Sequence, residues 1–129
     1  MKRMQDDILK VLLSEEQIAE KVAQIGRQIT EDYQDKNLLM VSVLKGSVVF
    51  MADLMRAVDC PARIDFMSVS SYGSGTKTSG VVKIVKDLDL NLEGYDLLLV
   101  EDILDSGRTL YYLREILEKR NPASIRIAT

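Results

Sequence analysis

The sequence predicts an α/β protein whose parallel β-sheet is flanked by helices. Short, nearly continuous apolar runs at 38–44 and 96–100 are typical of strands buried on both faces. Segments with apolar residues spaced by three and four lie between the expected strands, which indicates helices. Because strand, helix and strand alternate along the chain, right-handed crossovers between parallel strands are favoured. We expect a sheet of about four strands, at the low end of the usual ~4–6.

The first expected helix begins after Ser14. The run Ser14-Glu15-Glu16-Gln17 has the form of a capping box, since Gln17 lies three residues after the capping serine. Apolar residues then recur at steps of three and four as far as Tyr33. We therefore expect an amphipathic helix that ends near Tyr33.

The other expected elements follow in chain order, with glycine and proline at their boundaries. They are a strand over 38–44, a helix over 48–58 closed by Pro61, a strand over 62–69, a flexible polar loop over 70–80, a strand over 81–85, a turn over 87–94, a strand over 96–100, a helix over about 108–120 that stops before Pro122, and a strand from 124. Four methionines in the apolar runs are expected in the core: Met40, Met51, Met55 and Met67.

Composition limits the classes of function. The 129 residues suit one domain, 1–129, and 47% hydrophobic with 29% charged residues is ordinary globular composition. The net charge of -3 gives no basic excess, so neither a nucleic acid nor an anionic membrane is an expected partner. Histidine is absent, which excludes Ser/His and Cys/His catalysis and histidine metal sites. Acid–base or metal chemistry must then depend on carboxylates and lysines.

Several features favour the cytoplasm. Cys60 is the only cysteine, so an internal disulfide is excluded, which fits a reducing compartment. The N-terminus lacks the apolar stretch of a signal peptide. The most apolar segment, 38–51, is interrupted by Lys45 and Gly46, so it is not expected to span a membrane.

The segment 97–110 gives the strongest functional signal. An apolar strand delivers Glu101 and Asp102 to its carboxyl end, and a turn with Ser106 and Gly107 then opens a helix. Ligands of open α/β sheets bind at this edge, and the free N–H groups of a helix N-terminus suit a phosphate. Gly107 would let the backbone approach such a ligand closely.

The two adjacent carboxylates suit a different ligand group. Carboxylate oxygens only accept hydrogen bonds, so Glu101 and Asp102 could hold vicinal sugar hydroxyls or a hard cation such as Mg²⁺. A structural interpretation stays open from the pattern alone. Asp and Ser are common helix caps, and acidic pairs at strand ends are common on solvated surfaces.

This segment resembles the 5-phosphoribosyl 1-pyrophosphate (PRPP) binding motif of the type I phosphoribosyltransferases. That motif is an apolar strand, two acidic and two apolar residues, and a phosphate loop with Gly and Thr. The acidic pair with Asp105 is similar to the hypoxanthine-guanine branch. Three other segments are similar to this branch. Leu44-Lys45-Gly46-Ser47 resembles the pyrophosphate loop, and Ser71-Tyr72-Gly73 resembles the start of the flexible loop. Val85-Lys86-Asp87-Leu88 and Leu92-Glu93-Gly94 resemble the stretch that leads into the PRPP strand.

The resemblance implies a fold and an activity. The fold is the type I phosphoribosyltransferase fold, a Rossmann-like parallel sheet flanked by helices. The activity is purine salvage, in which the 5-phosphoribosyl group of PRPP passes to N9 of hypoxanthine or guanine to give IMP or GMP and pyrophosphate. Mg²⁺ is the implied cofactor, and a homo-oligomer (dimer or tetramer) is the implied assembly.

The resemblance extends from about Ser14 to the end of the sequence. Family members continue past the strand near Ser124, with a lysine and an aromatic residue that contact the purine and a second metal-binding aspartate. We therefore expect a truncated domain that lacks its C-terminal strands. The purine-facing residues have no match, so a preference among hypoxanthine, guanine and xanthine is not predicted.

The resemblance also implies site residues. Asp105 would be the general acid/base near the purine N7. The peptide entering Lys45 can be cis in the family. The remaining roles are pyrophosphate binding by Lys45 and Gly46; PRPP and ribose-5-phosphate binding by Glu101, Asp102, Asp105, Ser106, Gly107, Arg108 and Thr109; metal binding by Glu101 and Asp102; and cover of the reacting centre by Ser71 and Tyr72.

Plainer alternatives remain for these residues. Asp105 could cap the helix, the Arg108 side chain could lie on its surface with only the backbone N–H at the phosphate, and Lys45 could be an ordinary exposed lysine. Ser71 and Tyr72 could belong to a plain linker. A PRPP- or nucleotide-binding module without transferase activity is the alternative function. The acidic balance argues against RNA as its ligand.

Overall fold

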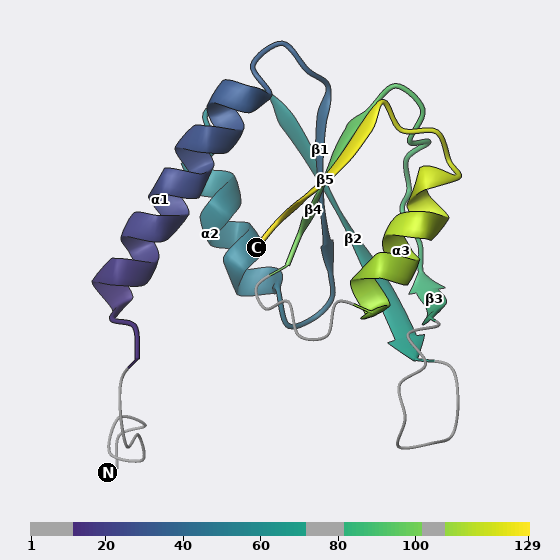
Figure 1. Cartoon of the computed structure of the whole chain (residues 1–129), viewed down its shortest axis with the longest axis horizontal. Helices are drawn as coiled ribbons and strands as arrows, with labels where there is room; N and C mark the ends of the chain where they lie inside the picture. The colour runs from purple at the N-terminus through teal and green to yellow at the C-terminus, as the bar shows by residue number, and fades with distance from the viewer. Residues whose placement is uncertain (1–11, 72–81, 102–107) are drawn as a thin grey trace.

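The computed structural model describes residues 12–71, 82–101 and 108–129. Within these ranges it contains one five-stranded sheet with helices on both faces (Figure 1). The elements are α1 (Glu15–Asp32), β1 (Leu38–Val43), α2 (Val48–Ala57), β2 (Ala62–Ser71), β3 (Val82–Lys86), β4 (Asp96–Val100), α3 (Arg108–Glu118) and β5 (Ser124–Ala128). Each expected helix and strand is present, with boundaries that differ by a few residues.

The sheet is mixed, with strand order β3-β2-β1-β4-β5. β1 pairs in parallel with β2 and β4, and β4 pairs in parallel with β5. β3 runs antiparallel to β2, so the expectation of an all-parallel sheet of about four strands is wrong for this edge strand. The connection from Ser71 to Val82 is too short for the crossover of about a dozen or more residues that parallel neighbours need.

The parallel strands start in register and therefore end at one edge. Leu38 is paired with Ala62 on one side and with Asp96 on the other, and Asp96 is paired with Ser124. The order of the strands reverses between β1 and β4. The chain passes from β1 outward to β2 through α2, and from β4 outward to β5 through α3, and these two helices pack on opposite faces of the sheet.

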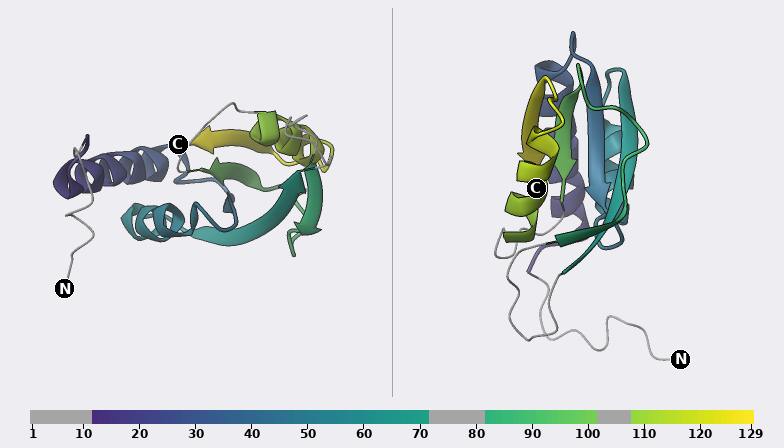
Figure 2. Two further views of the ribbon diagram at one scale, coloured as in Figure 1. Left: turned by 90° about the horizontal axis from the view of Figure 1, so that it is seen from below. Right: turned by 90° about the vertical axis from the view of Figure 1, so that its right-hand side faces the viewer.

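Helices cover both faces of the sheet, with α1 and α2 on one face and α3 on the other (Figure 2), and each face has its own core. Side chains of a strand alternate between faces, so the continuous apolar runs of β1 and β4 serve both layers. The core between α3 and the sheet includes Leu39, Val41, Leu97, Leu99, Leu110, Leu113 and Leu117. The core between the sheet and the pair α1 and α2 includes Ile29, Tyr33, Leu38, Met40, Met51, Leu54, Leu98 and Val100.

Three of the four methionines expected in the core are buried. Met40, Met51 and Met67 have no exposed surface, but Met55 is 40% exposed. The prediction for Met55 is wrong because α2 turns Met51 and Leu54 toward the sheet, and the next residue is rotated by about 100° around a helix of 3.6 residues per turn.

The start of α1 confirms the capping box. The Gln17 N–H donates to Ser14 Oγ (3.1 Å), and the Ser14 N–H donates to Gln17 Oε1 (2.8 Å). The helix ends at Tyr33, whose N–H donates to the carbonyl oxygen of Ile29 (3.0 Å). These bonds satisfy backbone groups that a helix terminus otherwise leaves without partners.

Gly26 is the point of closest approach between α1 and α2. A Cβ atom at this position would lie 2.5 Å from both the Cβ and the carbonyl oxygen of Ala57. Nearby, Thr30 Oγ1 donates to the Gly26 carbonyl (2.7 Å) and accepts from the Asp59 N–H (2.8 Å). The sequence pattern does not predict this contact, because a glycine inside a helix does not indicate which neighbouring element packs against it.

Gly26→Ala should destabilise the protein although alanine favours helix formation. Relief of the glycine cost is worth about 1 kcal/mol, whereas overpacking against backbone atoms costs about 1–3 kcal/mol. Urea unfolding measures the difference. The matched pair is Gln24→Ala and Gln24→Gly at an exposed position of the same helix, where alanine should be the more stable. The same order at position 26 would contradict the close contact.

A bidentate ion pair joins the end of β3 to the end of α3. Arg120 donates from Nη1 and Nη2 to the two carboxylate oxygens of Asp87, at 2.7 and 2.8 Å. This hydrogen bond from Arg120 is the main reason that the pKa of Asp87 lies below its ordinary value of 3.8; the Leu88 N–H also lowers it, and partial burial opposes both. The Asp87 side chain is 45% exposed, so water weakens the pair and we expect it to contribute below about 1 kcal/mol.

Arg120→Ala should therefore lower stability at neutral pH and have little effect in acid. A carboxyl whose pKa is depressed by folding contributes stability above its unfolded pKa and loses it as the pH falls through the folded pKa. Urea unfolding at about pH 7 and about pH 3 tests this. Arg56→Ala is the control, because its 2.7 Å pair with Asp53 lies within α2 and joins no two elements. A loss of stability that is equal at both pH values would count against the ion pair.

Candidate active site

β1 and β4 end side by side at the carboxyl edge of the sheet. The Leu44 N–H donates to the carbonyl oxygen of Met67 (2.8 Å), which extends the pairing of β1 with β2. The Glu101 N–H donates to the carbonyl oxygen of Ala128 (3.0 Å), which extends the pairing of β4 with β5. Since β1 and β4 are neighbours, Lys45, Gly46 and Glu101 follow strand ends that are about 4.8 Å apart.

This edge is the topological switch point of the sheet. The strand order reverses between β1 and β4, and the helices that follow these strands, α2 and α3, pack on opposite faces of the sheet. Ligands of open α/β sheets bind in the crevice expected at such a reversal, and we refer to this place as the crevice. The structure thus places two of the segments singled out in the sequence, 44–47 and the start of 101–109, on its two sides.

The loop after β1 has an accessible backbone. The Leu44–Lys45 peptide is cis, as the family resemblance implies. Lys45 and Gly46 are exposed, and a Cβ added at Gly46 would meet nothing within 4 Å. The Val48 N–H donates to the Lys45 carbonyl (3.1 Å), so α2 begins directly after the loop. A ligand can therefore reach the backbone of this loop.

The other side of the crevice begins at Glu101 and continues at the start of α3. Glu101 is half-buried at the end of β4. Asp102, Asp105, Ser106 and Gly107 lie outside the described residues. The helix starts at Arg108, and Thr109 is exposed in its first turn. Figure 1 shows that α3 begins near the carboxyl ends of the strands and runs back along the sheet, which directs its N-terminal N–H groups toward this edge.

Ser71 does not lie in the crevice itself. It is the last residue of β2 and is paired with Val82 of β3. Because Met67 is level with Val43, Ser71 lies four residues, or about 13 Å, beyond the end of β1. Tyr72 falls outside the described ranges, as does most of the loop expected over 70–80.

The acidic side chains present in the structure do not form a complete metal site. Across residues 12–71, 82–101 and 108–129 there is no cluster of three or more His, Cys, Asp or Glu side chains that could hold a metal ion. Mg²⁺ keeps several waters and takes oxygens from substrate phosphates, so one or two carboxylates suffice for it. The position of Glu101 at the crevice fits such a ligand.

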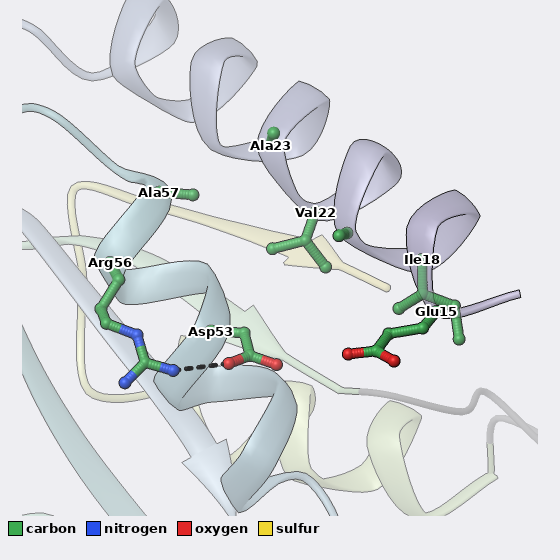
Figure 3. A pocket seen from close by; sticks show the side chains of 8 residues that line it. Glu15, Ile18, Val22, Ala23, Asp53, Arg56 and Ala57 are labelled. Carbon is green, nitrogen blue, oxygen red and sulfur yellow. Dashed lines mark hydrogen bonds and ion pairs between the residues drawn. The ribbon is translucent and has the colours of Figure 1, made fainter.

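A groove of about 640 Å³ lies elsewhere, between α1 and α2 (Figure 3). Ile18 and Val22 of α1 face it, with Asp53 and Arg56 of α2 on the other side. A neighbouring hollow of about 790 Å³ shares several of these residues and reaches Gly46. Neither hollow contains Glu101 or Thr109, so we assign the candidate site to the crevice and not to these grooves.

Sequence interpretation missed a pair of buried hydroxyls below the crevice. Ser42 and Ser47 have no exposed surface, and their side chains are hydrogen-bonded to each other. The available signal was a serine within the apolar run of β1 followed five residues later by a serine at the start of α2. From the sequence alone, Ser47 is indicated only as part of the loop motif.

The fold defines an open α/β protein of the kind that binds ligands at the carboxyl edge of its sheet, where the strand order reverses. Comparison with known proteins identifies the family. The model of the phosphoribosyl transferase domain matches residues 9–129, and the chain belongs to this family. The sequence-based predictions of fold class and family are confirmed.

Curated relatives and solved structures agree. The chain is 55% identical over 126 residues to the hypoxanthine-guanine phosphoribosyltransferase of Streptococcus pyogenes, which covers 98% of this chain and 70% of that protein. It is similar to the crystal structure of a hypoxanthine phosphoribosyltransferase from Staphylococcus aureus (TM-score 0.93, 46% identity, 98% of this chain and 68% of that chain). A hypoxanthine-guanine phosphoribosyltransferase from Bacillus anthracis matches with TM-score 0.88 and 43% identity over 95% of this chain and 72% of that one.

The helices give no indication of a membrane span. Of those in the described part of the chain, each is too short or too polar to cross a bilayer.

Proposed function

We propose that this chain acts in purine salvage, transferring the 5-phosphoribosyl group of PRPP to N9 of hypoxanthine or guanine, with IMP or GMP and pyrophosphate as products. The observation that supports this best is the position of the Lys45-Gly46 loop and Glu101 on the two sides of the switch point. Relatives that are 50–55% identical over 98% of this chain include enzymes named hypoxanthine-guanine phosphoribosyltransferase.

The 5′-phosphate would bind at the N-terminus of α3. Free N–H groups and the partial positive charge of a helix N-terminus attract a phosphate. Ser106 and Thr109 would add hydroxyl donors, Gly107 would allow close approach, and Arg108 would contribute its backbone N–H. Thr109 is exposed in the first turn of α3, where such a contact can form.

The pyrophosphate would bind on the opposite wall of the crevice. Lys45 supplies a positive charge, and the uncovered backbone at Gly46 can approach phosphate oxygens closely. Lysine and backbone N–H groups together are a common way of holding phosphates.

Glu101 and Asp102 would hold the ribose hydroxyls, either directly or through Mg²⁺. A carboxylate accepts hydrogen bonds from two neighbouring hydroxyls and is also a preferred magnesium ligand. When bound, Mg²⁺ would supply charge neutralisation for the pyrophosphate leaving group. In this role the two carboxylates would orient the sugar between its two phosphate groups.

Asp105 would exchange a proton with N7 of the purine as the general acid/base. Ser71, at the end of β2, and Tyr72, in the active-site loop predicted to follow it, would cover the reacting centre and exclude water from the cation-like sugar; both belong to the single domain 1–129. We further propose a cytoplasmic homo-oligomer, a dimer or tetramer, which light scattering can test.

Product formation from PRPP and a purine tests the proposal. Hypoxanthine, guanine and xanthine are each supplied with PRPP and Mg²⁺, beside a calorimetric titration with PRPP alone. We expect IMP or GMP from the first two bases, and no product when ribose 5-phosphate replaces PRPP. Binding of PRPP without turnover would favour a binding module instead, and absence of both would overturn the proposal.

A further inference from the structure

The loop proposed for pyrophosphate stands on a buried polar pair. Ser42 in β1 and Ser47 before α2 are the buried polar residues found in the described part of the chain, and both are fully buried. They lie on either side of the segment 43–46. Burial of a hydroxyl group lowers stability unless the group is hydrogen-bonded. The presence of two buried serine hydroxyls beside this loop therefore calls for an explanation.

The direction of the hydrogen bonds follows from the number of protons. Ser47 Oγ donates to the carbonyl oxygen of Val43 (2.7 Å). A serine hydroxyl has one proton, so Ser47 can only accept in its contact with Ser42. Ser42 is therefore the donor, and the bonds run from Ser42 to Ser47 and on to Val43.

These bonds close the loop on itself. The bond from Ser47 to Val43 joins the residue before α2 to the last residue of β1, across Leu44, Lys45 and Gly46. The Leu44 N–H is held by β2, and the Met51 N–H donates to the Ser47 carbonyl (2.9 Å). The loop is thus fixed to the sheet at one end and to α2 at the other, while Lys45 and Gly46 remain exposed.

We propose that Ser42 and Ser47 are positioning residues for pyrophosphate recognition. Their hydroxyls hold the backbone of Lys45 and Gly46 in one arrangement at the edge of the crevice, so that the loop binds phosphate oxygens without first having to order itself. A preorganised loop loses less conformational freedom on binding and so binds more tightly. This inference rests on the proposed function, because it needs a phosphate ligand at the loop.

Ser47→Ala removes both bonds of the pair, whereas Ser42→Ala leaves the bond from Ser47 to Val43 intact. We expect Ser47→Ala to weaken binding of PRPP and of inorganic pyrophosphate about 10-fold, and Ser42→Ala about 2–3-fold, from the usual net strength of a neutral hydrogen bond. Isothermal titration calorimetry gives both affinities, and thermal unfolding gives the stability of each variant.

Thr30→Val is the matched control for stability. Thr30 Oγ1 also makes two hydrogen bonds, to the Gly26 carbonyl and from the Asp59 N–H, but it joins α1 to the end of α2, away from the crevice. This variant should lose thermal stability as Ser47→Ala does and keep the wild-type affinity for pyrophosphate. A loss of pyrophosphate affinity in Ser47→Ala but not in Thr30→Val, with a similar loss of stability in both, would distinguish a positioning role from general support of the fold.

The outcomes separate the two proposals. Wild-type affinity in Ser47→Ala, or an equal loss of affinity in Thr30→Val, would overturn the positioning role while the proposed function stands. If Ser47→Ala does not fold, Ser42→Ala decides, and an unchanged affinity there would overturn the role. If the wild-type chain binds neither PRPP nor pyrophosphate, the proposed function fails and this inference fails with it.

Discussion

Replacement of Asp105 by Asn should lower the turnover number by about 10²–10⁴-fold, the usual contribution of a positioned general acid or base. Asparagine keeps the size and shape of the side chain but exchanges no proton near neutral pH. The affinity for PRPP should fall much less than the turnover number. Asp105 is predicted to contact the ribose 5-phosphate part of PRPP as well, but the other predicted contacts to it come from neighbouring residues of the loop and from the N-terminus of α3. The measurement is steady-state kinetics with PRPP and hypoxanthine, beside a PRPP titration.

Asp35→Asn is the matched control for this variant. Asp35 is an exposed carboxylate in the turn after α1, at the opposite end of β1 from the crevice. The Asp35→Asn substitution removes the same negative charge at a position far from the proposed site. An unchanged turnover number in Asp105→Asn would exclude the general acid/base role, and a helix cap would then be the better interpretation. A loss of PRPP affinity as large as the loss of turnover would instead indicate a binding role.

Features that depend on neighbouring residues in the sequence could be predicted. The capping box at Ser14 needs only two residues three positions apart, and it is present. The buried strand over 96–100 follows from its apolar run and lies where expected. The position of Glu101 directly after this strand is local in the same sense. In each case the structure has the interactions that the pattern requires.

Features that depend on tertiary contacts could not be predicted. The crevice is expected where the strand order reverses between β1 and β4, but no residue in either strand indicates which other strand it will pair with. Gly26 depends on where α2 crosses α1, and the exposure of Met55 depends on how α2 is rotated over the sheet. The Ser42–Ser47 pair likewise needs the turn that returns Ser47 to the end of β1.

Leu99→Ala should cost about 2–5 kcal/mol of unfolding free energy, out of about 5–15 kcal/mol for a typical domain. Leu99 is 1% exposed and packs in the cluster under α3 with Leu110 and Leu113. It lies between Val41 and Ile127 in register, so its neighbours on both sides are held by the sheet and can close the cavity only in part. Urea unfolding should show a lower midpoint with an unchanged slope.

Val49→Ala is the control, since it also shortens an aliphatic side chain, but at a position that is 72% exposed. It should change the unfolding free energy by less than about 0.5 kcal/mol. A similar loss in both variants would contradict the assignment of Leu99 to the core.

The same variant connects the core to the proposed site. A ligand that binds only the folded state adds about 2.7 kcal/mol of stability at 100 times its dissociation constant. PRPP at that concentration should therefore restore much of the midpoint lost in Leu99→Ala, because the Lys45-Gly46 loop lies between β1 and α2, and α2 packs on the other face of the sheet. Failure of PRPP to stabilise this variant, when it stabilises the wild type, would show that the cavity under α3 also displaces the N-terminus of α3 that is proposed to hold the 5′-phosphate.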